Sequence, residues 1–445
     1  MTFRSFIQNI YFSKTPLKPE DYEISRRFFL FEGSSAMGIF ALTSGAFLVG
    51  FANYMGANDE FNGIIAAIPV LAGVVQILSS FVFEKIEQRK FLISILCLFF
   101  RSMLGLIMFI PLIATDATTR LLLLGGGYGV AYLIASFIIP PASNWIVDLT
   151  PEYIRGKYLA QKDAYSLAFL TIITILMGRV LDIFRQNGNE YGGFVVIGIV
   201  VFLLAIINFY CLSSAKEPIP VKNGTPVRLK DVLLIPLKNI RFRKIIVLFI
   251  LWNAGLQVAG PFFAVYMVTG LKISYTYIMA MGVISSVIRV ILAPYWGKLA
   301  DQKSWFFSTK ASVGILAITH FMWFFVNSRT AWLMIPVVHI LGGIAWAGIN
   351  ISLFNIQFVF APREGRTMYL ASNAAVGGLV GFVSTLAGSA ILRILEEYRF
   401  SIVAFSVSNM QIIFALSGLV LGACSLFVHL LPKLNDPSQV DSPII

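Results

Sequence analysis

Two stretches of the chain, RGKYLAQKDA at residues 155–164 and RTMYLASNAA at residues 366–375, match at a constant offset of 211 residues (366 − 155). They share the arginine, the Tyr-Leu-Ala triplet and the final alanine. In a chain of 445 residues this offset is close to half the length. We infer that the chain consists of two related halves.

The apolar composition points to a lipid environment for both halves. The chain is 58% hydrophobic and only 13% charged, whereas soluble domains run near half apolar and a quarter charged. The apolar residues come in runs of about 20, the length that a helix needs to cross a ~30 Å hydrocarbon layer. The sequence therefore predicts an all-α membrane protein with twelve transmembrane helices in two pseudo-symmetric six-helix bundles. These helices are expected at residues 28–55, 60–83, 91–114, 119–147, 161–184, 192–213, 244–270, 273–297, 305–327, 330–360, 368–393 and 401–431.

The distribution of Lys and Arg predicts the orientation of these helices. Loops on the side that holds both chain ends carry 25 of the 34 Lys and Arg residues, and the opposite loops carry six. Cytoplasmic loops carry such an excess. We therefore expect a multi-pass protein of the cytoplasmic (inner) membrane with both termini in the cytoplasm. The net charge of +12 is explained by these loops, so it does not indicate a nucleic-acid partner.

The same counts predict the domain boundaries. The expected parts are a cytoplasmic N-terminal segment at 1–27, a six-helix bundle at 28–213, a cytoplasmic linker at 214–243, a second six-helix bundle at 244–431 and a cytoplasmic tail at 432–445. Within the linker, Val227–Asn239 has the pattern of a short interfacial amphipathic helix. A solvated connection between the halves fits the linker equally well, and the sequence leaves both alternatives open.

A second pair of related segments follows the second and eighth apolar runs. The first reads SFVFEKIEQRK at residues 80–90 and the second GKLADQKS at residues 297–304, and both place an acid four residues after a small residue. The second copy resembles the cytoplasmic loop motif of the major facilitator superfamily, Gly-x-Leu-Ala-Asp-Arg-x-Gly-Arg-Arg. The first copy is degenerate, with Ser80 for Gly and Glu84 for Asp. The resemblance implies the major facilitator fold, as in bacterial twelve-helix transporters of unassigned substrate, with a monomer as the usual state.

The loops of these two repeats supply the candidate gating residues. Acids near cytoplasmic helix ends, beside basic residues, can form ion pairs in one conformational state and lose them in another. The alternative is that these charges only extend into the membrane interface. The candidates are Glu84, Lys85, Arg89, Gly297, Asp301, Arg155 and Arg366.

Charged residues inside the spans are candidates for function because a charge in the hydrocarbon region is costly. Arg101 lies about 15 Å into the third span and Arg289 about 12 Å from the end of the eighth, at 1.5 Å per residue. In the family, the first, fourth, seventh and tenth helices line the cavity, and the second, fifth, eighth and eleventh close it. The resemblance therefore implies that Arg289 is better placed to bind substrate than Arg101. Arg179 and Asp182 are three residues apart, so we expect them to pair.

Proton coupling has two candidate residues. Glu32 lies near the start of the first span, where a carboxylate beside a low-dielectric cavity can titrate. His339 lies in the tenth span, and a histidine titrates in the physiological range. An interfacial charge at Glu32 and a structural hydrogen bond at His339, or at His320 in the ninth span, are the alternatives.

Uncharged polar residues on the expected lining helices complete a candidate substrate site. A ligand pocket combines apolar and aromatic walls with a few placed polar groups. Residues four apart share one helix face, which holds for the pairs Asn253 with Gln257 and Trp346 with Asn350. Hydrogen bonds between helices are the alternative explanation. With Arg289, the substrate-binding candidates are Asn253, Gln257, Trp346, Asn350, Asn144 and Asn373.

These features favour a secondary active transporter (a symporter or antiporter) that moves a small solute by alternating access. Deep cations outnumber deep acids, which favours an anionic or zwitterionic solute. The alternatives are a multidrug exporter of lipophilic compounds and a non-transporting membrane receptor or assembly factor. The sequence shows no nucleotide loop, no acid–His–metal cluster and no nucleophile arrangement, so we expect no enzyme activity, no cofactor and no metal.

Overall fold

The computed structural model describes residues 11–12, 17–83, 86, 88–218, 235–362, 366–396, 400–402 and 405–434. The chain divides into two compact units. The first comprises Met1–Thr225 and Met267–Met279, and the second comprises Pro226–Tyr266 and Ala280–Ile445. The short segment Met267–Met279 is therefore part of the first unit although it lies in the second half of the sequence.

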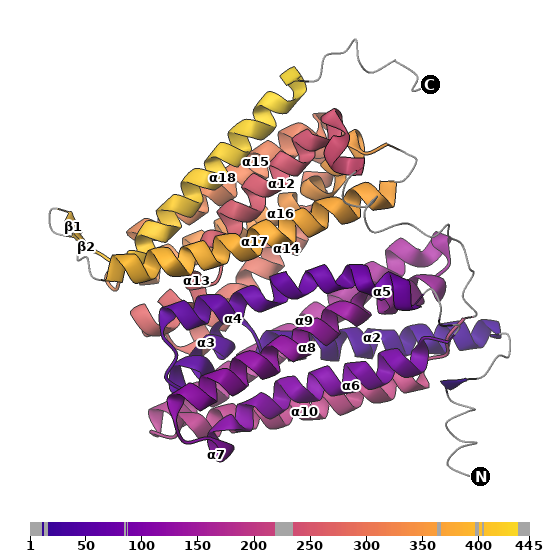
Figure 1. Ribbon diagram of the computed structural model, residues 1–445, viewed down its shortest axis with the longest axis horizontal. Helices are drawn as coiled ribbons and strands as arrows, with labels where there is room; N and C mark the ends of the chain where they lie inside the picture. The colour runs from indigo at the N-terminus through magenta and orange to yellow at the C-terminus, as the bar shows by residue number, and fades with distance from the viewer. Residues whose placement is uncertain are drawn as a thin grey trace. The chain divides into compact units, whose positions relative to one another are not determined.

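The first unit is a bundle of long helices (Figure 1). Its segments are α2 (Pro19–Leu42), α3 (Gly45–Tyr54), α4 (Asp59–Ala72), η1 (Gly73–Val75), α5 (Gln76–Phe83), α6 (Lys90–Leu106), η2 (Ile107–Phe109), α7 (Ile110–Ile113), α8 (Ala117–Asp148), α9 (Glu152–Gln186) and α10 (Glu190–Ser214). α10 packs against α6, α2 and α9, and α8 packs against α4, α5 and α6.

The second half of the chain has a similar series of helices. Its segments are α12 (Ile240–Ala259), α13 (Phe262–Val265), the π-helix η3 (Tyr266–Gly270), α14 (Tyr275–Gln302), α15 (Trp305–Met322), η4 (Trp323–Phe325), α16 (Ala331–Phe360), α17 (Arg366–Glu396) and α18 (Asn409–Leu434). α15 packs against α16 and α18, and α12 packs against α17 and α18. Phe400–Ile402 and Phe405–Val407 form a short antiparallel hairpin, β1–β2, between α17 and α18.

Nine helices of the described residues are long and apolar enough to span a bilayer, or ten if the bent pair α2–α3 is one span. The remaining two expected spans are helical as well. The range 60–83 is divided into α4, η1 and α5, and 305–327 is covered by α15 and η4. The expected start of the last span was wrong, because Phe400–Ile402 and Phe405–Val407 are β-strands and the helix begins at Asn409.

The bend in the first span has a local cause. Thr43 donates its hydroxyl to the carbonyl of Ile39 and ends α2 at Leu42. Gly45 then takes a positive φ of 54°, a conformation that side chains disfavour and glycine accepts. The axis turns by 41° between α2 and α3.

Each half of the chain has its own tryptophan-centred core. In the first, Trp145 is fully buried and lies edge-to-face on Phe29, with ring centroids 5.1 Å apart. In the second, Trp252 of α12 meets Trp346 of α16 edge-to-face at 5.8 Å. Aromatic pairs in this arrangement add to the burial of their apolar area.

Candidate functional site

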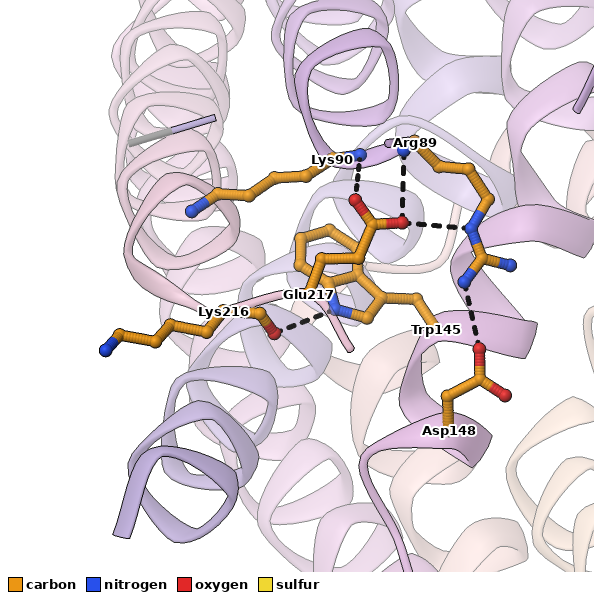
Figure 2. A network of polar contacts seen from close by, with 6 residues as sticks. All are labelled: Arg89, Lys90, Trp145, Asp148, Lys216 and Glu217. Carbon is orange, nitrogen blue, oxygen red and sulfur yellow. Dashed lines mark hydrogen bonds and ion pairs between the residues drawn. The ribbon is translucent and has the colours of Figure 1, made fainter. Parts of the chain in front are cut away.

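A charged network joins three segments of the first unit and is centred on Arg89, the residue before α6 (Figure 2). The Arg89 Nε and backbone N–H both donate to Glu217 Oε1, at 3.0 Å each. Its Nη2 donates to Asp148 Oδ2 at 2.9 Å. The backbone N–H of Lys90 donates to Glu217 Oε2 at 2.9 Å. One arginine thus links the start of α6, the end of α8 and the chain that leaves α10.

The position of Glu217 follows from helix physics. The first N–H groups of a helix have no partner within the helix, and a carboxylate stabilises that end through its negative charge. Glu217 supplies that carboxylate to the start of α6, although it lies 128 residues after Arg89 in the sequence. Trp145 of α8 orients this part of the chain, because its Nε1 donates to the carbonyl of Lys216 at 3.1 Å (Figure 2).

Arg89 stays charged in this setting. Its side chain is 8% exposed, and that of Glu217 is 7% exposed. Burial alone would lower the pKa of the Arg89 guanidinium, but the bonds to Asp148 and Glu217 outweigh it and raise the pKa above its usual value. Because the pKa of Arg89 is raised in the folded protein, its ion pairs stabilise the fold at every pH below the ordinary pKa of a guanidinium. This stabilisation is lost only when the pH rises above that range. The network is therefore a fixed ion-pair lock on the arginine side, not a pH switch.

Other predicted gating residues have different surroundings. Glu84 and Lys85 lie outside the described residues, as does most of the expected linker helix. The side chain of Arg366 is likewise not described. Arg155 donates to the carbonyl of Thr150 at 3.2 and 3.3 Å, a local contact at the start of α9. Within the described part of the chain Asp301 is exposed and has no ion-pair partner, and no heavy atom lies within 4 Å of a Cβ built at Gly297.

A second ion pair lies inside the helices of the first unit. Arg101 Nη2 of α6 donates to Glu32 Oε1 of α2 at 3.1 Å, and both side chains are largely buried. Asn208 of α10 donates to the Glu32 carbonyl at 3.0 Å and to Ser35 Oγ at 2.9 Å. The intramembrane arginine of the third span and the predicted coupling carboxylate are therefore partners. Their pairing leaves no net charge at this position.

The expected pair of Arg179 and Asp182 is wrong. The Asp182 oxygens accept hydrogen bonds from the backbone N–H groups of Tyr275 and Thr276, at 2.9 and 2.8 Å. The first N–H groups of a helix have no partner within it, and a carboxylate at that end is stabilised by them. Arg179 is left exposed on α9.

Arg289 lies half-buried on α14, and no hydrogen bond or ion pair joins it to any residue that the structure describes. The two deep arginines thus differ in kind, because Arg101 has a carboxylate partner and Arg289 has none in the described chain. A buried or half-buried cation in a membrane normally pairs or faces a polar space.

The uncharged candidates fall into two groups. Asn253 and Asn373 take part in helix packing: a Cβ at Gly377 would lie 2.7 Å from Asn253 Nδ2, and Asn373 donates to Gln357 at 2.8 Å across α17 and α16. These two match the alternative of helix–helix contacts. Trp346 packs on Trp252 and is half-buried.

The second group remains open to a ligand. Gln257 of α12 is half-buried, and Asn350 of α16 and Asn144 of α8 are exposed. Among the described residues, no hydrogen-bond partner is found for the side chains of Asn350 and Asn144. These three candidates stay predictions as substrate-binding residues.

His320 and His339, the two histidines considered from the sequence, have structural partners. His339 Nδ1 lies 2.8 Å from the carbonyl of Ile335 one turn earlier, so this nitrogen is the donor. His320 Nδ1 lies 2.6 Å from Ser417 Oγ, whose hydroxyl donates to the carbonyl of Gly255. Since the Ser417 proton is used there, His320 donates through Nδ1, and the chain of bonds ties α15, α18 and α12 together.

Glu217 and Asp148 are the site residues that the sequence analysis missed. Glu217 stands in a stretch read as linker, and Asp148 ends a span. The available signal was Arg89, a basic residue at a span start whose charge needs an acid at the same end of the bundle.

The helix series and the sequence repeat agree with one family. A sequence profile of the Major Facilitator Superfamily matches residues 28–385. The chain belongs to the major facilitator superfamily. It is therefore a multi-pass membrane protein of a transporter family, with the fold that the loop motif implied.

Solved superfamily transporters share this fold at low sequence identity. A mutant of the nucleoside transporter NupG matches with a TM-score of 0.66 and 13% identity, over 92% of this chain and 99% of that one. The POT family transporter PepTSo matches with a TM-score of 0.66 and 11% identity, over 96% and 100%. A bacterial metal transporter matches with a TM-score of 0.57 and 14% identity, over 94% and 100%. No curated protein matches the chain in sequence. At these sequence identities the likeness shows the fold alone.

Proposed function

We propose that this chain is a secondary active transporter that moves a small anionic or zwitterionic solute across the cytoplasmic membrane by alternating access. The observation that carries the proposal is the contrast between its deep arginines. Glu32 neutralises Arg101, while Arg289 has no counter-charge among the described residues. A solute carboxylate or phosphate would supply it.

The energetics favour such a ligand. An unpaired cation in a low-dielectric setting is costly, and a guanidinium binds carboxylate and phosphate through two parallel bonds. The interaction of an anionic group with Arg289 would therefore be more favourable in free energy than the same interaction in water. Gln257, Asn350 and the aromatic face of Trp346 are proposed to orient the rest of the solute.

Coupling to protons is proposed at Glu32. Protonation of this carboxylate would remove the partner of Arg101 and leave an unpaired charge where α2 and α6 both pack on α10. Proton binding and helix packing would then be linked, as a coupled transporter requires. His339 is the weaker candidate, because its Nδ1 is already bonded to a backbone carbonyl.

Topology and assembly belong to the same proposal. The Lys and Arg distribution supports cytoplasmic termini in an inner membrane, and the two six-helix bundles are proposed at 28–213 and 244–431. A monomer is proposed, because the two halves of one chain supply the pseudo-symmetric pair that alternating access needs.

The test is a thermal-shift screen of the purified full chain against organic anions, amino acids, sugars, peptides and lipophilic cations. A ligand at 100 times its Kd stabilises by about 2.7 kcal/mol, which is well resolved. We expect an anion or zwitterion to stabilise the parent protein and to lose this effect in Arg289→Gln. Stabilisation by lipophilic cations alone, equal in both proteins, would support the multidrug alternative instead.

Arg179→Gln is the matched control. It removes the same charge from another spanning helix, at an exposed side chain. We expect it to keep the ligand-induced shift of the parent. Loss of the shift in both variants would mean that net charge, not the position of Arg289, governs binding.

A further inference from the structure

The repeated Tyr-Leu-Ala triplet places one tyrosine at the same point in each half of the chain. Tyr158 lies on α9 and Tyr369 on α17, 211 residues apart (369 − 158). α9 packs against α2, the first long helix of the first half, and α17 packs against α12, the first long helix of the second. The two tyrosines are 7% and 6% exposed. A tyrosine buried to this extent usually has a partner for its hydroxyl, and here the partner identifies what each tyrosine holds.

In the first half the partner is the backbone of α2. The Tyr158 hydroxyl donates to the carbonyl of Arg26 at 2.8 Å, near the start of a helix that begins at Pro19. Arg26 in turn donates from Nη1 to the carbonyl of Leu149 at 3.0 Å, directly after α8. No other hydrogen bond joins α2 to α9 among the residues that the structure describes. The Tyr158 hydroxyl is therefore the polar tie between these two helices.

In the second half the partner is the residue that caps α12. Asn239 donates from Nδ2 to the Tyr369 hydroxyl at 3.3 Å, and its Oδ1 accepts from the backbone N–H of Phe242 at 2.9 Å. Phe242 is fully buried and lies edge-to-face on the Tyr369 ring, with centroids 4.9 Å apart. The bonded atoms differ from those of the first half, but the elements correspond. Each tyrosine binds the start of the first long helix of its own half.

Both helix pairs stay close beyond the tyrosine through contacts at glycines. A Cβ at Gly38 of α2 would lie 2.8 Å from a ring carbon of Phe169 of α9, and one at Gly377 of α17 would lie 2.7 Å from Asn253 Nδ2 of α12. Residue numbers rise together along each pair, so the paired helices run parallel. Packing at small residues brings two axes together without a directional bond. At the end that carries the triplet, the directional bond comes from the tyrosine.

We propose that Tyr158 and Tyr369 are equivalent positioning residues, each of which fixes the start of the first long helix of its half to the triplet-bearing helix throughout the transport cycle. The inference rests on the alternating-access transport proposed above. In a carrier built from two repeats, the helices of each half keep their places while the halves change their arrangement. Helix ends open locally at low free energy unless tertiary contacts hold them, and a buried hydroxyl bond is such a contact. The matched arginine of the first copy has no such role, because Arg155 bonds only to the turn before α9.

The first test is hydrogen–deuterium exchange of the full-length protein in lipid nanodiscs, with no added solute. Tyr158→Phe and Tyr369→Phe keep the rings and remove only the hydroxyls. Loss of one hydrogen bond of ordinary strength corresponds to roughly fivefold faster local exchange. We expect this change at residues 23–30 in Tyr158→Phe and at residues 242–247 in Tyr369→Phe, with the other half of the chain unchanged in each case.

The controls are Tyr165→Phe on α9 and Tyr295→Phe on α14, where the tyrosines are 54% and 65% exposed. Each removes one hydroxyl from a spanning helix and should exchange like the parent. Faster exchange across all helices would mean that the two buried tyrosines contribute only general stability. Faster exchange in one half alone would show that they are not equivalent. Either result, or no change at all, would overturn the proposal.

Spin-label distances, measured by electron paramagnetic resonance, test the positioning itself, which a merely structural role would leave unchanged. Ile24→Cys on α2 and Lys157→Cys on α9 place the labels at exposed positions, while the three native cysteines are buried. We expect one narrow distance in the parent and in Tyr165→Phe, and a broader distribution in Tyr158→Phe. A distribution as narrow in Tyr158→Phe as in the parent would contradict the positioning role. Neither measurement uses a solute, so a failure of the proposed transport is read separately, from the ligand screen.

Discussion

Replacing Arg89 tests whether the charge network at the start of α6 is a lock or an incidental contact. Arg89→Gln keeps a polar side chain and removes the ion pairs with Glu217 and Asp148. Breaking a buried ion pair from one side costs about 3–5 kcal/mol. Two features lower the expected cost. Glu217 keeps two backbone N–H donors, and Asp148 is 38% exposed. We therefore expect a loss of about 2–3 kcal/mol in the free energy of unfolding.

The assay is a reversible unfolding titration of the full chain in mixed micelles, followed by tryptophan fluorescence. Arg27→Gln is the matched control, because its pair with Glu23 has side chains that are 71% and 59% exposed. Exposed pairs contribute about 0–1 kcal/mol, so the control should stay close to the parent. A double-mutant cycle of Arg89→Gln with Glu217→Gln should give a coupling energy of about 1–2 kcal/mol.

The reasoning is refuted by either of two results. The first is an Arg89→Gln protein as stable as the Arg27→Gln control. The second is additivity of the Arg89 and Glu217 variants, which would mean that the two charges do not act as a pair.

Two further predictions concern packing inside each half. Glu32→Gln leaves Arg101 without its carboxylate and should lower the free energy of unfolding by about 3–5 kcal/mol in the same titration. Combining Glu32→Gln with Arg101→Met should recover part of that loss. A double variant less stable than Glu32→Gln alone would contradict the pairing. Gly388→Ala would place a Cβ against the backbone carbonyl of Val258 and should cost about 1–3 kcal/mol through overpacking. Gly422→Ala, where no heavy atom lies within 4 Å, should change the melting temperature little, and equal effects at both sites would contradict the close packing of α12 and α17.

Helix positions were readable from the sequence because a bilayer demands apolar runs of a set length. Most described residues of each expected span are helical, with short breaks such as 43–44, 260–261 and 273–274, while the expected start of the last span holds the strands β1 and β2. Span ends are less predictable. Once the chain leaves the hydrocarbon, a hairpin, a turn or a helix can each provide hydrogen-bond partners for the backbone N–H and C=O groups. The bend at Gly45 depends on one positive φ that no periodicity reveals.

Charge partners were much harder to predict. Glu32 and Arg101 are 69 residues apart, and only the packing of both α2 and α6 on α10 within one bundle brings them together. The Arg179–Asp182 expectation relied on helical spacing, which takes no account of competing donors from elsewhere in the chain. Asp182 bonds to the start of α14 instead, 93 and 94 residues away. Glu217 was missed because an acid beyond a span end is ordinary until its partner is known.

The most direct test of the central claim is solute uptake into proteoliposomes. Vesicles with the parent protein, with Arg289→Gln or with Arg179→Gln would be incubated with one mixture of organic anions, zwitterions, sugars and lipophilic cations, and their contents compared by mass spectrometry with protein-free vesicles. We predict uptake of an anion or zwitterion by the parent and by Arg179→Gln, with a loss of roughly tenfold or more in Arg289→Gln, as expected for removal of a charged hydrogen-bonding partner. Uptake restricted to lipophilic cations, or vesicle contents equal to those of protein-free vesicles for every solute, would contradict the proposed function.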